Sequence, residues 1–308
     1  MIIGIEGTGS QGWLQFDMQR SYVRKVLQQS QQAIKYYFIG PCMTGSDGPQ
    51  IVDGAWKLIH ERLKGTKESV QLTGYSRGAA YCIFLAQQVL DSFGEGRISH
   101  LILFDAVARQ AEFRIPDQIP ASVKIAFHAY RDPRGGSRDG FENVGLWAQN
   151  GGKTQLFKKM FPASHGGMGG TWYDAKEDEN GDHSDDAMNV LGKGANSQSA
   201  NQMRVALNSS VDNRGMAVAP NFRKSIQYTQ KNYPSVLDQQ ISDRNQLNIP
   251  PTPVMSIHQD RMASELAGVW MWQMLTQYGV LPSGSSGKSS APTTCGKYFT
   301  VGSGARVS

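Results

Sequence analysis

Apolar positions along the chain fall into short runs that alternate with longer amphipathic stretches. Two stretches, 52–64 and 79–93, repeat apolar residues at the spacing of a helix face. Six runs have the length of buried strands: 2–5, 35–40, 68–73, 98–104, 123–130 and 155–161. Strands that alternate with helices indicate an α/β fold. We therefore predict a mostly parallel central sheet with helices on both faces.

The pattern changes after residue 170. The segment 171–250 is polar and has few sustained apolar runs, so we expect a lid-like insertion. A short strand at 254–257 and an amphipathic helix at 262–278 follow it. From 282 the composition becomes rich in Ser and Gly, as in a linker. These features predict one domain over 1–281 and a flexible tail over 282–308.

The charged residues and the cysteines indicate which binding partners to expect. The net charge of the 308-residue chain is +5, but its Lys and Arg residues are scattered rather than clustered. We therefore expect no nucleic acid as a partner, whereas contact with an anionic membrane surface fits the charge. Three widely spaced cysteines indicate neither a disulfide framework nor a zinc site.

An acidic segment at 174–186 is the one pattern that suggests a metal. It fails the calcium-loop spacing, because counting back from Gly181 puts Lys176 at the first ligand position and Ala187 at the twelfth. We interpret it as a solvated loop and expect no metal or cofactor. The first residues show no secretory leader, which favours a cytoplasmic location, and export by a contact-dependent secretion system stays open.

One motif organises the chemistry. Gly74-x-Ser76-x-Gly78 follows an apolar run and opens a helical pattern. This is the spacing of a nucleophile elbow, in which a strained strand-to-helix turn exposes the serine hydroxyl of an α/β-hydrolase. The glycines two positions away avoid clashes in that tight turn. Ser76 is therefore the predicted nucleophile.

Two backbone N–H groups are expected to bind the oxyanion of the tetrahedral intermediate. One belongs to the glycine-rich loop after the first strand, near Thr8, and the other to Arg77, directly after the nucleophile. The same loop contains Gly7-x-Gly9-x-x-Gly12, a weak phosphate-binding pattern that lacks the Lys-Ser/Thr of a P-loop. The elbow downstream favours the oxyanion interpretation.

The general base should be a histidine that follows the nucleophile in the sequence. His165 follows a strand and lies in a loop with four glycines, which can fold tightly against the serine. His258, between a short strand and a helix, is the alternative base. His128 lies inside a strand, so we expect a structural role for it.

The acid that orients the base has two candidates. Asp105 and Asp132 both end strands, and Asp132 lies one strand further along, at the usual station of a triad acid. We take Asp132 as the first choice and Asp105 as the alternative.

Five motifs in order resemble the α/β-hydrolase domain of type VI secretion phospholipase effectors and their uncharacterised relatives. The family's Asp-Gly-Thr-Gly loop corresponds to Glu6-Gly7-Thr8-Gly9, and its Gly-Phe-Ser-Arg-Gly-Ala elbow corresponds to 74–79. Its Phe-Asp-Thr-Val and His-Ala-x-x-Asp-x-Arg motifs correspond to 104–107 and 128–134. Its Gly-Val-His-Ser-Asp-Val-Gly-Gly loop is matched in part by 163–170. The resemblance implies a Ser76–His165 pair, and it does not choose between the two aspartates.

The sequence thus predicts a serine ester hydrolase, foremost a lipase or phospholipase, whose substrate is an acyl ester or phospholipid. The resemblance adds an immunity protein or a secretion spike as partners, should the protein be an effector. A soluble esterase or thioesterase for small acyl groups is the first alternative, and a non-catalytic binding module of the same fold is the second.

Overall fold

The described part of the chain is built around one seven-stranded sheet. The computed structural model describes residues 1–10, 20–42, 45–108, 113–131, 143–149, 153–171, 190–191, 255–287 and 305–306. The strands are β1 (Ile2–Ile5), β2 (Lys35–Phe38), β3 (Val70–Tyr75), β4 (Ile98–Phe104), β5 (Val123–Arg131), β6 (Gln155–Phe161), β7 (Val190–Leu191), β8 (Met255–Ser256) and β9 (Ala305–Arg306). The helices are α2 (Tyr22–Gln29), α3 (Gly48–Leu63), α4 (Ser76–Phe93), α5 (His165–Met168) and α11 (Ile257–Gln277).

The order of strands in the large sheet is β6-β5-β4-β3-β1-β2-β9. The pairings of β1 with β2 and β3, of β3 with β4, and of β4 with β5 are all parallel. The strand β9 pairs antiparallel with β2 at one edge. The prediction of an α/β fold with a mostly parallel sheet is confirmed.

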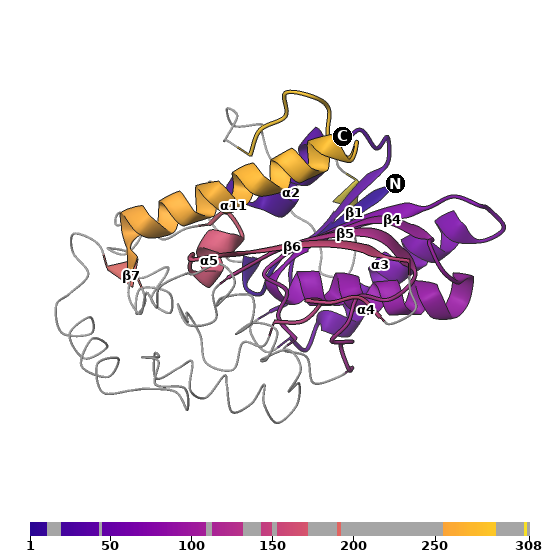
Figure 1. Ribbon diagram of the computed structural model, residues 1–308. Helices are drawn as coiled ribbons and strands as arrows, with labels where there is room; N and C mark the ends of the chain where they lie inside the picture. The colour runs from indigo at the N-terminus through magenta and orange to yellow at the C-terminus, as the bar shows by residue number, and fades with distance from the viewer. Residues whose placement is uncertain are drawn as a thin grey trace. The chain divides into compact units, whose positions relative to one another are not determined.

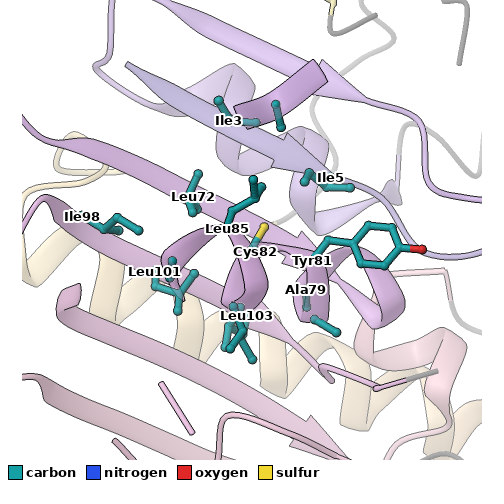
Figure 2. Close-up of a cluster of buried hydrophobic side chains, with 14 of the residues drawn as sticks. Ile3, Ile5, Leu72, Ala79, Tyr81, Cys82, Leu85, Ile98, Leu101 and Leu103 are labelled. Carbon is teal, nitrogen blue, oxygen red and sulfur yellow. The ribbon is translucent and has the colours of Figure 1, made fainter. Parts of the chain in front are cut away.

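Side chains from alternate positions of the strands fill two apolar layers, one on each face of the sheet. Ile3, Ile5 and Leu72 are fully buried in a cluster with residues of α3 and α4 (Figure 2). On the other face, Gly4 lies directly under α2, where an added Cβ would come within 2.7 Å of Leu27 Cδ1. Figure 1 shows α3 and α4 on one side of the sheet and α2 on the other.

The second apolar layer also receives the carboxyl-terminal half of α11. Tyr22 of α2 packs with tilted rings against Phe104 of β4 and against Trp272 of α11, with ring centroids 5.3 and 5.7 Å apart. Tyr278, directly after α11, contacts Phe127 of β5 with centroids 5.4 Å apart. Helices on both faces, as predicted, therefore shield the central strands from water.

The chain divides into two compact units, which we describe separately. The first comprises 1–129, 143–159 and 268–308, and the second comprises 130–142 and 160–267. The predicted domain limits at 281 and 282 stay a prediction. Within the first unit, two residues of the expected tail, Ala305 and Arg306, form the edge strand β9.

Several predicted features lie outside the described residues. These are Asp132, the acidic segment 174–186 and almost all of the expected insertion at 171–250. Among the helices that the structure describes, none is both long and apolar enough to cross a bilayer.

Candidate active site

Ser76 lies in a strained turn between β3 and α4. Its φ is +57°, in the left-handed region that side chains other than glycine rarely adopt, while Tyr75 before it is still extended. Ser76 is also the first residue of α4, which begins three residues earlier than the predicted helix. The strand-to-helix turn that the motif predicts is therefore present.

The two glycines of the motif are required by close backbone contacts. A Cβ on Gly74 would lie 2.7 Å from the backbone of Ala79, and a Cβ on Gly78 would lie 2.2 Å from the carbonyl oxygen of Glu6. No side chain larger than hydrogen fits at either position without a backbone shift. The spacing in the sequence thus reflects close packing of α4 against both β3 and the end of β1.

The loop after β1 lies beside Ser76. A Cβ on Gly7 would come within 3.0 Å of the Cβ of Ser76, so the backbone of this loop is in contact with the elbow. Gly9 donates to the carbonyl of Pro41 at 2.9 Å, and Ser10 Oγ accepts from the N–H of Gly40 at 2.8 Å. These bonds fix the loop that contains Thr8, the first predicted oxyanion donor.

Arg77, the second predicted oxyanion donor, is the second residue of α4. Its N–H belongs to the first turn of the helix, where the positive end of the helix dipole favours a negative charge. Its side chain is buried and donates from Nη1 to the carbonyl of Cys42 at 3.3 Å. The elbow and the loop after β2 are therefore joined through this arginine.

Asp105 occupies a second strained turn, at the end of β4. Its φ is +47°, and Ser76 is the only other non-glycine residue of the described chain with a positive φ. The carboxylate is fully buried and accepts from Nδ2 of Asn143 at 2.7 Å. The turn contacts the elbow directly, because the N–H of Val107 donates to the carbonyl of Ser76 at 3.1 Å. Backbone strain of this kind concentrates at functional sites.

His128 supports the turn at Asp105 from the neighbouring strand β5. Its Nε2 accepts from the N–H of Ala106 at 3.2 Å, and its Nδ1 lies 3.0 Å from the carbonyl of Gly145. The ring is therefore neutral, with its proton on Nδ1, because one nitrogen must accept and the other must donate. Complete burial lowers the pKa of His128 to about 4. The two contacts agree with the structural role expected for this histidine.

Glu6 is a fully buried acid at the start of the loop that contains Thr8. Its Oε1 accepts from the hydroxyl of Tyr37 at 3.1 Å and from the hydroxyl of Ser21. Its Oε2 is buried and has no hydrogen-bond partner among the residues that the structure describes. Desolvation by burial raises the pKa of Glu6 to about 7, although both hydroxyls and the Gly7 N–H favour the charged form. In the sequence, the only sign of this residue is that Glu6 stands where the Asp-Gly-Thr-Gly loop of the resembled family has its aspartate.

In the second unit, His165 begins the four-residue helix α5, and Ser164 caps that helix. The side chain of Ser164 accepts from the N–H of Gly167 at 3.0 Å, and Ser264 donates to the carbonyl of Gly167 at 2.5 Å. His165 is buried, and its Nδ1 lies 3.4 Å from Nη1 of Arg131, the last residue of β5. Because a guanidinium can only donate, this contact makes Nδ1 an acceptor and places the ring proton on Nε2.

The predicted site residues are thus distributed over both units. Ser76, Thr8, Arg77 and Asp105 lie in the first unit, with Asp105 joined to the elbow through Val107. His165 lies in the second unit. His258 lies in the first turn of α11, directly after the short strand β8. The strand β8 belongs to a separate two-stranded sheet with β7.

Asn143 and Arg131 are the contacts that sequence reasoning missed. Asn143 lies in a short stretch without periodicity, 38 residues after the aspartate that it contacts, so no local signal indicates it. Arg131 lies between the predicted strand 123–130 and Asp132, and that position was its only signal. Within the described residues, no group of three or more metal-binding side chains occurs.

The chain is similar to known proteins at the level of the fold. The elbow at the carboxyl end of β3, in a parallel sheet with helices on both faces, is the arrangement of the α/β-hydrolases. The fold is α/β-hydrolase-like. No protein-family profile and no curated protein matches the sequence.

Solved structures match at low identity. An uncharacterised protein from Pseudomonas aeruginosa is 11% identical, with a TM-score of 0.31, over 55% of this chain and 41% of its own. A protein of Pectobacterium atrosepticum named as a YdeN-like hydrolase is 16% identical, with a TM-score of 0.28, over 54% of this chain and 80% of its own. The NocB thioesterase domain from the nocardicin cluster is 14% identical, with a TM-score of 0.32, over 53% of this chain and 84% of its own. The chain thus spans less than half the length of the Pseudomonas protein.

Proposed function

We propose that the protein is a serine hydrolase that cleaves acyl esters through a covalent intermediate on Ser76. The strained φ of +57° at Ser76 is the observation that carries this proposal. A serine in an ordinary helix start adopts a negative φ, and the established cause of a positive φ in this motif is the positioning of a nucleophile. The prediction of an exposed hydroxyl is not met by the described residues, in which Ser76 is only 4% exposed.

In the proposed reaction, Ser76 Oγ attacks the acyl carbonyl while His165 takes the serine proton. The oxyanion that forms is stabilised by the backbone N–H groups near Thr8 and of Arg77. His165 then returns the proton to the leaving alcohol, and water hydrolyses the acyl-enzyme by the same steps in reverse order. The nucleophile, the base and the oxyanion donors of these steps are all residues of this chain, and water is the second substrate.

Activity requires His165 to present an acceptor nitrogen to Ser76. The contact with Arg131 places the proton on Nε2, the nitrogen that accepts the serine proton in a Ser-His-Asp triad. Catalysis therefore includes a change of tautomer or a rotation of the ring that brings Nδ1–H to a carboxylate. The buried, hydrogen-bonded Asp105 is a candidate for that carboxylate, and Asp132 stays the alternative.

The test is covalent labelling with a fluorophosphonate, combined with turnover of p-nitrophenyl esters. Wild-type protein should gain one adduct on Ser76 and release p-nitrophenol, whereas Ser76→Ala should do neither. Ser99→Ala is the matched control, because Ser99 lies on β4 and its hydroxyl contacts only the carbonyl of Val70 among the described hydrogen bonds. Labelling that survives Ser76→Ala would contradict the assignment, and the binding-module alternative predicts no labelling at all.

We further propose a lipid acyl ester as the substrate class, as the sequence resemblance implies. One observation favours it: Met262, Leu266 and Val269 lie on one face of α11 and are 50%, 57% and 47% exposed. Exposed apolar residues in one patch are typical of surfaces that contact lipid or protein. Turnover of phospholipid vesicles should exceed turnover of short soluble esters; the reverse preference would favour the small-acyl esterase. Membrane contact, secretion and an immunity partner belong to the same proposal.

A further inference from the structure

Glu6 is a buried acid that the proposed reaction does not use, and it lies next to the loop that does. Its own N–H donates to the carbonyl of Phe38 at 3.1 Å, and its carbonyl faces the backbone of Gly78 in the first turn of α4. The next residue, Gly7, contacts Tyr75 and Ser76. Glu6 thus connects β1, β2 and the elbow within one unit.

The environment of the carboxyl group is asymmetric. Both hydroxyl donors, from Ser21 and Tyr37, bond Oε1, whereas the buried Oε2 has no partner within the described part of the chain. A carboxylate with one unpaired oxygen in an apolar interior is costly, and a proton on that oxygen relieves most of the cost. The charged group that acts on Glu6 is Arg24 of α2, and it ranks below desolvation and the hydrogen bonds in its effect. The geometry therefore favours protonation and deprotonation of the Glu6 carboxyl group at Oε2 while the bonds to Oε1 hold the side chain in position.

We propose that Glu6 is a positioning residue of the ester-cleaving site, and that the loop from Gly7 to Thr8 stabilises the oxyanion best when Glu6 is neutral. Two effects act in the same direction. The ionised carboxylate attracts the N–H of Gly7 and so orients the loop backbone toward itself. It also adds a negative charge in the residue directly before this loop, and like charges repel strongly where water is excluded.

The inference rests on the proposed function and predicts a specific pH profile. Because the pKa of Glu6 is raised to about 7, its ionisation falls within the working range of a histidine base. The value of kcat/KM for a p-nitrophenyl ester should fall by about tenfold as pH rises from 6.5 to 8.5, since a like charge one or two residues away has an effect of that order. The fall should appear in kcat more than in KM, because the repulsion acts on the transition state.

Glu6→Gln and Tyr37→Phe test the assignment in different ways. Glu6→Gln keeps the shape and removes the ionisation, so the alkaline fall should disappear. Tyr37→Phe removes a donor that favours the charged form, so the fall should remain and move to higher pH. If Glu6→Gln does not fold by circular dichroism, the position of the alkaline fall in Tyr37→Phe decides.

The outcomes separate this inference from the proposed function. Wild-type protein that neither turns over esters nor reacts with fluorophosphonate contradicts the proposed function itself. If the wild-type protein is active and its activity at alkaline pH follows the same profile as that of Glu6→Gln, the role of Glu6 is overturned. If only Tyr37→Phe folds, an alkaline profile identical to that of wild type overturns it. A purely structural Glu6 would change stability and the amount of active protein, and would leave the shape of the pH profile unmoved.

Discussion

Glu6 and His128 should give the folding stability of this protein two opposite pH dependences that cancel. Burial raises the pKa of Glu6 from 4.5 to about 7 and lowers the pKa of His128 from 6.5 to about 4. Between pH 4.5 and 6.5, folding therefore adds a proton to Glu6 and removes one from His128. The net proton uptake by this pair is close to zero, so the pair leaves stability nearly constant there.

Each residue alone would have a large effect. Glu6 favours folding at low pH, and this contribution is lost as pH rises from 4.5 to about 7. His128 favours folding at high pH, and this contribution is lost as pH falls from 6.5 to about 4. Over the two pH units that both windows share, each change amounts to about 3 kcal/mol in the free energy of unfolding.

Single variants should show the pH dependence of the free energy of unfolding that each residue contributes. Glu6→Gln leaves only the histidine, so its stability should fall by about 3 kcal/mol relative to wild type between pH 6.5 and 4.5. His128→Asn leaves only the acid, so its stability should fall by a similar amount as pH rises from 4.5 to 6.5. Urea unfolding, followed by tryptophan fluorescence at five pH values, gives these free energies by linear extrapolation.

The double variant is the internal control. It should restore the wild-type slope, because neither ionisation remains, while all other titrating groups are the same in the four proteins. Two single variants whose slopes deviate from wild type in the same direction would refute the reasoning. So would variants with unchanged slopes, because one or both groups would then titrate in the folded protein as in water.

Two further substitutions test the packing of the site. Gly78→Ala should destabilise the protein by about 3 kcal/mol or more in urea unfolding, because its Cβ would lie 2.2 Å from a backbone oxygen. Gly94→Ala, where φ is +82° but no atom lies within 4 Å, should cost only about 1–2 kcal/mol, and equal costs would argue against the close contact at Gly78. Asn143→Ala should cost about 2–3 kcal/mol, since it leaves buried oxygens of Asp105 and Ala106 without its two hydrogen bonds. It should also lower ester turnover more than Gln149→Ala, a control in which the lost side-chain amide bonds Ala121 and Gln87 and not the Asp105 turn. Asn143→Ala with wild-type stability would show that the amide does not hold the Asp105 turn.

The elbow could be predicted because its determinants are local. The serine and its glycines lie within five residues, and the clashes that exclude a larger side chain come from Ala79 and from the end of β1. The strands could be predicted for a similar reason, since short apolar runs mark them, and the central strands β1 and β3 are buried along their whole length. Helix starts were less accurate: α4 begins at Ser76 instead of 79, because its first turn is polar or small and has no apolar period.

The supporting contacts could not be predicted, because they join distant segments. Asn143 meets Asp105 across 38 residues, and the Arg131 guanidinium meets His165 across 34. Neither pair has a spacing that a single sequence can reveal. The sequence also left open whether Asp105 or Asp132 is the acid of the triad. The positive φ and the burial of Asp105 are physical arguments for Asp105. Asp132 lies outside the described residues.

The edge strand β9 has a consequence for the synthesis of this protein on the ribosome. It pairs with Tyr36 and Tyr37 of β2, although nearly the whole described chain lies between the two strands. During translation, β2 is made early and its outer edge stays open until β9 has emerged. An open, aromatic-rich edge is a template for pairing with other nascent chains. Between the synthesis of β2 and that of β9, the growing chain is thus open to misassembly at this edge, and pairing with β9 covers Tyr36 and Tyr37.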